Sequence, residues 1–263
     1  MAANPPKSEN VASVLKVFSV LETLSEDSRA SLASIAQKAM TSKSTTHRLL
    51  QTMVDLGYVE QDADTEKYGL TLKLFSVAVK PLKTQSDLLR VADRAMGKLS
   101  RATGESINLG LMDDHDQRVV YAHHYASAYN LSMNSTIGMR NPLHSTSLGK
   151  ALLAFRDEDE VAERLSKMSF EKRAPNTVTS ASEMKEHLQR TRARGYSEEI
   201  EESEAGVRCM AVPLLNHLGK SVAAISISFP LFRFDETRKQ DYIELLTSVG
   251  RETSAALGYT PDS

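Results

Sequence analysis

Three stretches near the N-terminus carry apolar residues at helical spacing. In 11–21, 32–39 and 46–53 the apolar positions recur with the period of an α-helix, which predicts three amphipathic helices. Ser31 is placed to cap the second helix. Only a short polar interruption around Thr41-Ser42 separates the second helix from the third, and this outline is typical of a helix-turn-helix.

Two short segments with strand character follow the third helix. Gly57 is placed to end that helix, and 58–60 and 67–70 are predicted strands joined by a polar turn at 62–65. A hairpin directly after the third helix is a wing. The sequence therefore predicts a winged helix-turn-helix domain over 11–75.

A helical linker and a mixed domain are predicted beyond the wing. Helical patterns over 72–82 and 86–103 predict linker helices across 76–103, with a bend at Pro81. Farther on, the pattern changes to the alternation of strands. Strands are predicted near 107–111, 119–121, 207–214 and 221–229, and helices near 145–155, 158–167, 181–194 and 235–257. The fold class is therefore α+β, with a sensor-like domain over 104–260.

Composition narrows the class of protein. The 263 residues suit two domains, and the 41% hydrophobic residues supply apolar cores. The net charge of -2 gives no whole-chain sign of nucleic-acid binding, so a DNA-binding face must be local. The single cysteine, Cys209, excludes an intrachain disulfide. We expect a disordered tail at 1–10, no cofactor, no membrane span and a cytoplasmic location.

Charge within the predicted helix-turn-helix favours DNA. No Asp or Glu occurs from 28 to 54, whereas Arg29, Lys38, Lys43 and Arg48 do, so a near-neutral chain contains a locally basic unit that suits phosphates. The polar side chains outside the apolar stripe of the third helix suit base edges and phosphates. The predicted DNA contacts are Ser42, Lys43, Ser44, Thr45, His47, Arg48 and Gln51, with Lys67 in the wing. An ordinary solvated helix face is the alternative.

A loop that leads into a helix suits an organic anion. Residues 141–146 lead into the helix predicted from about Ser145, so backbone N–H groups near Ser147 and Leu148 lie in its first turn. Free N–H groups and the helix dipole favour a carboxylate there. The alternative is that Ser145 or Thr146 only caps the helix.

The acid-rich stretch 198–204 leads into a strand that contains Cys209. Such acids usually form a solvated loop. A hairpin partner with Ser226 and Ser228 on one face nevertheless gives a candidate polar pocket, in which Glu199 accepts hydrogen bonds from the hydroxyls of a ligand.

Enzymatic chemistry has little support in the motifs. The chain lacks a Gly-x-Ser-x-Gly elbow, a Gly-rich phosphate loop and a His-Glu-x-x-His zinc motif. His123 and His124 are neighbours on a predicted strand, so they face opposite sides and make a poor metal clamp. Lys150 is interpreted as a surface lysine rather than a catalytic amine. We expect neither a catalytic nor a metal site.

Three motifs occur in order along the chain. They are Ser42-Lys43-Ser44-Thr45-Thr46-His47-Arg48-Leu49-Leu50, the stretch 142–154, and Gly206-Val207-Arg208-Cys209 followed by Ile225-Ser226-Ile227-Ser228. With their surroundings, about 11–259, they resemble the IclR family of bacterial regulators. The resemblance implies a winged helix, a linker helix that pairs subunits, a GAF-like effector domain, and a homodimer or a dimer of dimers. It places effector contacts at Asn130, Met133, Asn141, Ser147, Leu148, Glu199, Cys209, Ser226 and Ser228, with Arg140 nearby adding charge.

Within that family, 13–18, 68–75 and 140–143 resemble the repressors of pectin and hexuronate catabolism that respond to 2-keto-3-deoxygluconate. The polar residues Asn130, Asn141 and Glu199 suit a polyhydroxylated keto acid better than glyoxylate or an aromatic acid. We therefore predict a repressor of sugar-acid (pectin, hexuronate or alginate) catabolic genes, which a small keto acid releases from double-stranded operator DNA. The alternatives are an activator of the same family and an enzyme with an accessory helix-turn-helix.

Overall fold

The computed structural model describes residues 11–27, 29–79, 86–133 and 135–260. The predicted disordered tail and the predicted bend at Pro81 lie outside these residues. No helix in the described ranges is both long enough and apolar enough to cross a membrane.

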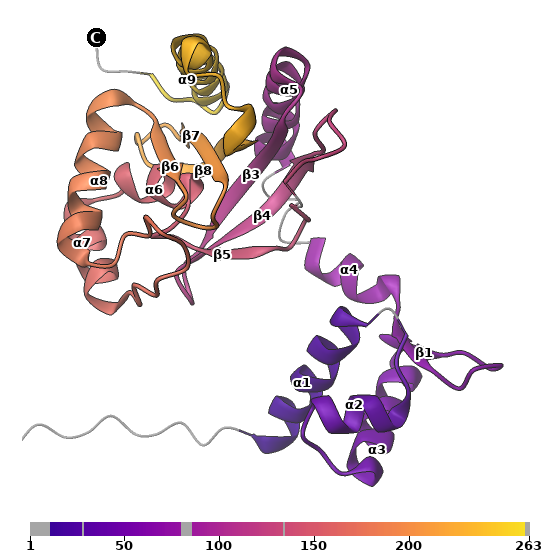
Figure 1. Cartoon of the computed structure of the whole chain (residues 1–263). Coiled ribbons are helices and arrows are strands. Elements are labelled where there is room, and N and C mark those ends of the chain that lie inside the picture. The colour runs from indigo at the N-terminus through magenta and orange to yellow at the C-terminus, as the bar shows by residue number, and fades with distance from the viewer. Residues whose placement is uncertain (1–10, 28, 80–85, 134, 261–263) are drawn as a thin grey trace, which may run out of the picture. The chain divides into compact units, whose positions relative to one another are not determined.

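Contacts divide the chain into two compact units, Met1–Gln85 and Ser86–Ser263, each with an apolar core. The first is the predicted winged helix-turn-helix. Its elements are α1 (Ala12–Glu26), α2 (Leu32–Lys38), α3 (Lys43–Asp55), β1 (Val59–Gln61), β2 (Tyr68–Leu70) and α4 (Leu72–Val79) (Figure 1). The side chains of Ser31 and Ser42 cap α2 and α3 by accepting a backbone N–H from the first turn of each helix. Local sequence therefore fixes where both helices begin.

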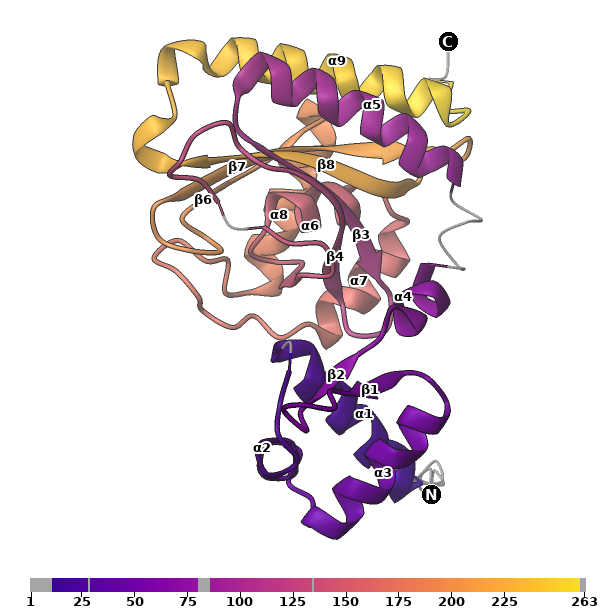
Figure 2. The same cartoon turned by 90° about the vertical axis from the view of Figure 1, so that its right-hand side faces the viewer.

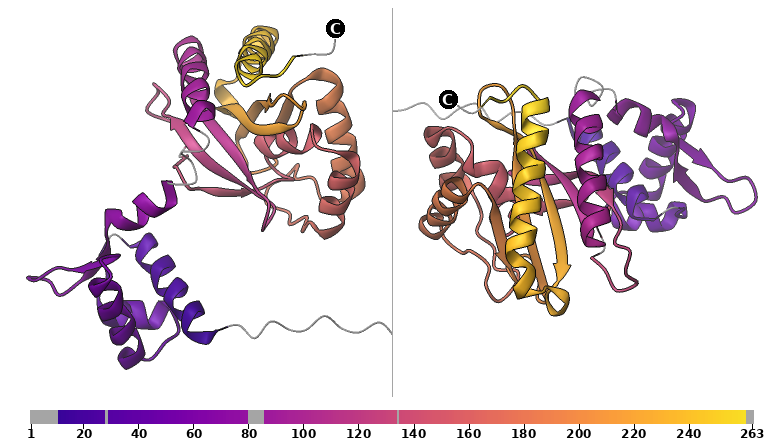
Figure 3. Two further views of the ribbon diagram at one scale, coloured as in Figure 1. Left: turned by 180° about the vertical axis from the view of Figure 1, so that it is seen from behind. Right: turned by 90° about the horizontal axis from the view of Figure 1, so that it is seen from above.

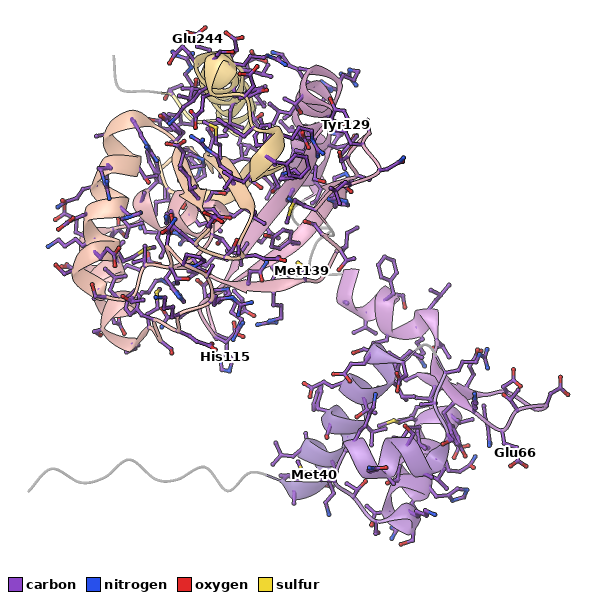
Figure 4. All side chains as sticks on the ribbon, in the orientation of Figure 1. Met40, Glu66, His115, Tyr129, Met139 and Glu244 are labelled. Atoms are coloured by element: carbon purple, nitrogen blue, oxygen red, sulfur yellow. The ribbon has the colours of Figure 1, made fainter. Side chains whose placement is uncertain are left out.

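The wing is a two-stranded antiparallel hairpin whose turn is ordered by one carboxylate. Asp62 Oδ1 accepts hydrogen bonds from the backbone N–H groups of Asp64 and Thr65, at 3.2 and 2.9 Å, and from the Thr65 hydroxyl at 2.8 Å. Glu66, labelled in Figure 4, has a left-handed φ of 54° at the end of this turn. The next residue, Lys67, is exposed and directly precedes the returning strand β2.

The predicted apolar stripe of α1 does not form the core of this unit. The core takes Val20 and Leu24 from α1, together with residues of α2, α3 and the hairpin. Leu15 and Phe18, which the helical spacing places on the apolar face, are 56% and 58% exposed. α1 therefore has two apolar faces, and one of them has no partner within the unit.

The second unit is built on a six-stranded antiparallel sheet of order β5-β4-β3-β8-β7-β6. Its strands are β3 (Ser106–Asp113), β4 (Arg118–Tyr125), β5 (Arg140–Pro142), β6 (Ser197–Ile200), β7 (Val207–Leu215) and β8 (Ser221–Pro230), and its helices are α5 (Ser86–Thr103), α6 (Ser147–Ala154), α7 (Glu158–Lys167), α8 (Ala181–Arg194) and α9 (Lys239–Ala256). The edge strands β5 and β6 are short and were not predicted. The predicted linker is not a separate segment. Its helix α4 belongs to the first unit, whereas α5 belongs to the second and contributes Met96 and Leu99 to its core.

The two faces of this sheet differ chemically. α5 and α9 lie side by side across one face (Figures 2 and 3) and pack on apolar residues such as Ile107 and Ile227. α6 packs on β3, β7 and β8 from the other face. Because successive side chains of a strand alternate between faces, Asn108 and Ser226 of the same strands lie on the side of α6. The fold thus collects polar side chains beneath one helix.

Candidate functional site

The predicted DNA-reading face of α3 is exposed. Thr46, Leu50 and Met53 are buried in the core of the first unit, as the spacing predicts. Thr46 Oγ1 donates to the Ser42 carbonyl at 3.0 Å, which ties the first turn of α3 to its cap. The predicted contacts Ser42, Lys43, Ser44, His47, Arg48 and Gln51 are exposed, Thr45 is half-buried, and Lys67 of the wing is exposed. The face presents hydroxyl, imidazole, amide and cationic groups together.

Ion pairing separates the basic residues of the helix-turn-helix into two groups. Lys38 pairs with Asp27 at 2.7 Å, and Arg29 pairs with Glu60 at 2.7 Å. By contrast, no carboxylate lies within ion-pairing distance of Lys43, Arg48 or Lys67 among the described residues. Lys43 and Arg48 on α3 and Lys67 in the wing are therefore the cations left for phosphates or bases.

The N-terminus of α6 presents backbone donors above the polar face of the sheet. Thr146 caps the helix, and its Oγ1 accepts the Gly149 N–H at 3.0 Å. The N–H groups of Ser147 and Leu148 belong to the first turn, which has no intrahelical acceptors. A Cβ at Gly149 would lie 2.1 Å from the Leu143 carbonyl oxygen. Glycine is required there, because α6 begins against the backbone of the preceding loop.

A hydrogen-bonded cluster lies on the sheet at this point. Cys209 Sγ donates to Ser228 Oγ at 3.3 Å, and Asn108 Nδ2 donates to the same oxygen at 3.1 Å. The Oδ1 atom of Asn108 bonds to His124 Nδ1 at 2.9 Å. Ser226 is the cross-strand neighbour of Asn108 and is buried as well. The cluster joins β7, β8, β3 and β4.

Glu199 supports a loop, which differs from the role predicted for it. Its buried carboxylate accepts the backbone N–H groups of Glu202 and Ser203 at 3.0 and 3.3 Å and the Ser203 hydroxyl at 2.7 Å. Burial raises the pKa of the Glu199 carboxyl. These bonds use three of the roughly four acceptor positions of the carboxylate, and the β6–β7 register places Glu199 opposite Cys209. Glu199 therefore lies beside Cys209 of the cluster and holds the loop after β6 in place.

The interpretation of Lys150 as a surface lysine is wrong. Its side chain is 1% exposed, and Nζ lies 2.5 Å from both carboxylate oxygens of Glu202 and 3.1 Å from the Glu198 carbonyl oxygen. Burial lowers the pKa of Lys150 and raises the pKa of Glu202 to about 7, whereas their mutual attraction opposes both shifts. The three hydrogen bonds of Nζ favour the ion pair. Lys150 thus ties α6 to the loop after β6.

Two family models match this chain. The one described as the IclR helix-turn-helix domain matches residues 13–63, and the one described as the bacterial transcriptional regulator IclR C-terminal matches residues 82–255. The chain belongs to the IclR family of bacterial transcriptional regulators.

Named relatives support the same conclusion over nearly the whole chain. The HTH-type transcriptional regulator KdgR of Escherichia coli (strain K12) is 46% identical over 251 residues, which is 95% of this chain and 94% of that protein. The crystal structure of Thermotoga maritima IclR has a TM-score of 0.79 at 29% identity and covers 95% of this chain and 100% of that chain. The crystal structure of an IclR homolog from Microbacterium hydrocarbonoxydans, complexed with 4-hydroxybenzoate, has a TM-score of 0.80 at 25% identity. It covers 93% of this chain and 98% of that chain. This IclR-family member is KdgR-like.

The remaining family pocket positions are spread more widely. Asn141 Nδ2 donates to the Tyr121 hydroxyl at 3.2 Å on the same side of the sheet as the cluster. The Arg140 guanidinium instead pairs with Asp113 and Asp116 at 2.5 and 2.7 Å. Its charge is therefore neutralised outside the cluster, contrary to expectation. Asn130 is exposed and Met133 is half-buried in the loop after β4, and Ser106 Oγ donates to the Met133 carbonyl at 3.4 Å.

Sequence reasoning missed three polar members of this IclR-family site. Asn108, Tyr121 and His124 stand on β3 and β4 within hydrogen-bonding distance of predicted residues or of each other. The strand pattern contained one signal, because Asn108 interrupts an apolar run between Ile107 and Leu109 and must face the side away from them. His123, on the opposite face, bonds to Asp93 at 2.8 Å, as alternation predicts. Within the described residues, no group of three or more His, Cys, Asp or Glu is arranged to hold a metal ion.

Proposed function

We propose that this IclR-family regulator is a repressor of sugar-acid catabolic genes, and that a small organic acid such as 2-keto-3-deoxygluconate releases it from its operator. The proposal rests on two features of one chain. The exposed α3 face carries cations that have no carboxylate partner among the described residues, and a polar cluster lies beneath α6. The likeness to KdgR over 95% of the chain supports the class of regulated gene. DNA contacts are assigned to the α3 face and to Lys67.

The effector class follows from the donors around the cluster. The N–H groups of Ser147 and Leu148 suit a carboxylate, because the N-terminus of a helix attracts negative charge. The hydroxyls of Ser226 and Ser228 suit the oxygens of a sugar acid. The 4-hydroxybenzoate held by the Microbacterium hydrocarbonoxydans homolog supports an organic acid in this fold. Since Ser147 and Ser226 are nearly inaccessible to solvent, entry of the effector requires movement of the surrounding loops.

Release of DNA then follows from a change in the spacing of two recognition helices. A dimer reads two half-sites, and its affinity depends on the distance between its copies of α3. An effector that binds better to one arrangement of the dimer shifts the population toward it. The proposed effector thus favours an arrangement in which the two copies of α3 no longer match the operator.

A titration of the protein–operator complex with sugar acids tests this proposal. In a mobility-shift assay on a palindromic fragment from the gene's own promoter region, 2-keto-3-deoxygluconate is expected to reduce the bound fraction progressively. Galacturonate, glucuronate and pyruvate serve as comparison acids. Tighter DNA binding on addition of the acid would identify an activator-type response instead. Turnover of the acid together with absent operator binding would favour an enzyme.

The proposed homodimer has support in the first unit. Leu15 and Phe18 of α1 are exposed, and Leu72 and Phe75 of α4 are 84% and 65% exposed. Leu15 and Phe18 are three residues apart on α1, as are Leu72 and Phe75 on α4, and neighbouring exposed apolar side chains mark surfaces that associate with other proteins. A second copy of this chain is the partner that a two-half-site operator requires.

Replacing Phe18 by glutamate is expected to weaken the dimer at least about tenfold, because an apolar contact worth about 1.5–3 kcal/mol is lost and a charge is placed in the interface. Operator affinity should fall with it. Light scattering across a dilution series, followed by mobility shift, measures both effects. Phe232→Glu is the matched control, since Phe232 is 73% exposed on the second unit. Unchanged dimerisation of the Phe18 variant would place the interface elsewhere.

A further inference from the structure

Asn108 links two ends of the polar cluster through one buried amide. The residue is 0% exposed. Its Nδ2 donates to Ser228 Oγ at 3.1 Å, and its Oδ1 bonds to His124 Nδ1 at 2.9 Å. A buried amide with both ends bonded keeps its position, because losing either partner would leave a polar group unsatisfied inside the protein. Asn108 therefore holds a serine and a histidine in a set relation.

The state of His124 follows from this bond. Burial lowers the pKa of His124, so the imidazole is neutral at neutral pH and carries one ring proton. Because Asn108 Oδ1 can only accept, the proton lies on Nδ1 and leaves Nε2 as an acceptor. If the amide is turned over, Nδ2 donates to Nδ1 and the proton moves to Nε2. The hydrogen bonds that link Ser228, Asn108 and His124 therefore have two possible arrangements, in which all donors and acceptors are exchanged together.

Hydrogen-bonding capacity remains unused around the amide. Ser228 Oγ accepts from Asn108 and from Cys209, so its own O–H is left to donate. Ser226 Oγ, buried next to Asn108, makes no hydrogen bond with any side chain or backbone group of the described residues. Hydroxyl groups whose protons are not used within the protein suit a ligand that both donates and accepts hydrogen bonds.

We propose that Asn108 is a specificity-determining residue of the effector site, positioned by His124, and that the pair selects acids with hydroxyl groups over acids with a bare carbon chain. The inference rests on the proposed effector site and extends it to residues on β3 and β4. A ligand hydroxyl both donates and accepts hydrogen bonds. It can therefore bond to the serine hydroxyls in either arrangement of the Ser228–Asn108–His124 hydrogen bonds. An alkyl group there would leave the hydroxyl protons of Ser226 and Ser228 and the second N–H of the Asn108 amide without acceptors. Sites built to bond a hydroxyl reject analogues that lack it strongly.

A comparison of two acids with the same reactive end tests this selection. 2-Keto-3-deoxygluconate and 2-oxobutyrate both carry a 2-keto carboxylate, but only the first has hydroxyls. Isothermal titration of the full-length wild-type protein with each acid gives the selectivity ratio. In Asn108→Leu, which keeps the side-chain size, affinity for 2-keto-3-deoxygluconate is expected to fall at least about tenfold, whereas affinity for 2-oxobutyrate changes less than about threefold.

Two further variants keep the test decisive. His124→Phe removes the partner of Asn108 at the partly exposed end of the chain and is expected to lower the same ratio, so it stands in if Asn108→Leu does not fold. Thr191→Val is the matched control, because Thr191 is equally buried on α8 and its hydroxyl has no partner in the described residues. That control should leave the ratio unchanged.

The outcomes separate this inference from the proposed function. Wild-type protein that binds 2-keto-3-deoxygluconate while both Asn108→Leu and His124→Phe keep the wild-type ratio would overturn the role of the pair and leave the effector class intact. Equal losses for both acids would show that the pair only fastens β4 to β3, which also overturns it. Wild-type protein that binds none of the sugar acids would remove the proposed effector and this inference together.

Discussion

Substituting Arg48 by alanine is expected to weaken specific operator binding about 10- to 100-fold, because one arginine contact to a base edge is worth about 1–3 kcal/mol. Arg48 is exposed on the face of α3 opposite its buried stripe, and no carboxylate of the described residues competes for its guanidinium. Fluorescence anisotropy with the operator and with a scrambled duplex measures the specific part of the loss.

The Arg48 experiment has a matched control and a second readout. Arg90→Ala removes the same charge from an exposed position on α5, where Arg90 pairs with Asp87, and should leave operator affinity unchanged. Stabilisation of Arg48→Ala by the effector should equal that of the wild type, since the two sites lie in separate units. Undiminished operator binding by Arg48→Ala would show that another element enters the groove.

Replacing Lys150 by methionine is expected to lower the free energy of unfolding by about 3 kcal/mol, because removal of one partner from a buried ion pair leaves the other charge uncompensated. For a domain of this size the melting temperature should fall by about 6 to 12 °C. Lys167→Met is the control, since Lys167 pairs with Glu163 at an exposed position on α7. Thermal and urea unfolding measure both variants.

The stability deficit of Lys150→Met should grow as the pH rises above about 7. In the wild type, burial raises the pKa of Glu202 to about 7, and Lys150 opposes that rise. Without Lys150 the pKa of Glu202 rises further. A raised carboxyl pKa contributes stability at low pH that is lost as the pH rises through the folded-state pKa. The wild-type loss levels off once the pH has passed about 7, whereas the loss in the variant continues to higher pH.

Adding Glu202→Gln to Lys150→Met should recover part of the stability and remove the growth of the deficit with pH, because no ionisable carboxyl then remains at that position. Unfolding curves at pH 6 and pH 8.5 provide the comparison. A Lys150→Met protein as stable as the wild type at both pH values would contradict the structural role of the ion pair.

The helices of the DNA-binding unit could be predicted from sequence because their determinants act within one turn. The caps Ser31 and Ser42 bond to N–H groups in the turn that each begins. The face of α3 follows from the spacing of Thr46, Leu50 and Met53, which needs no knowledge of distant residues. The exposed face of α3 that we propose to read DNA is the complement of that stripe, so the periodicity located it.

Burial that depends on distant partners could not be predicted. The stripe of α1 containing Phe18 looks apolar enough for a core, but the other elements of the unit pack on Val20 and Leu24 instead. Lys150 is interior only because Glu202, brought next to it by β6 and the loop that follows, supplies the opposite charge. The residues next to a lysine in a helix do not indicate whether a distant carboxylate will pair with it.

Sequence alone determined the two-domain order, the exposed face of α3 and the loop that precedes α6, because hydrophobic periodicity, caps and motifs depend on neighbouring residues. The tertiary structure alone decided which side chains meet at the proposed effector site, with Asn108 and His124 joining Ser228 and with Glu199 turned toward its own loop. The physical reason is strand register: a pairing between β3, β4 and β8 sets those contacts, and register is a property of the assembled sheet.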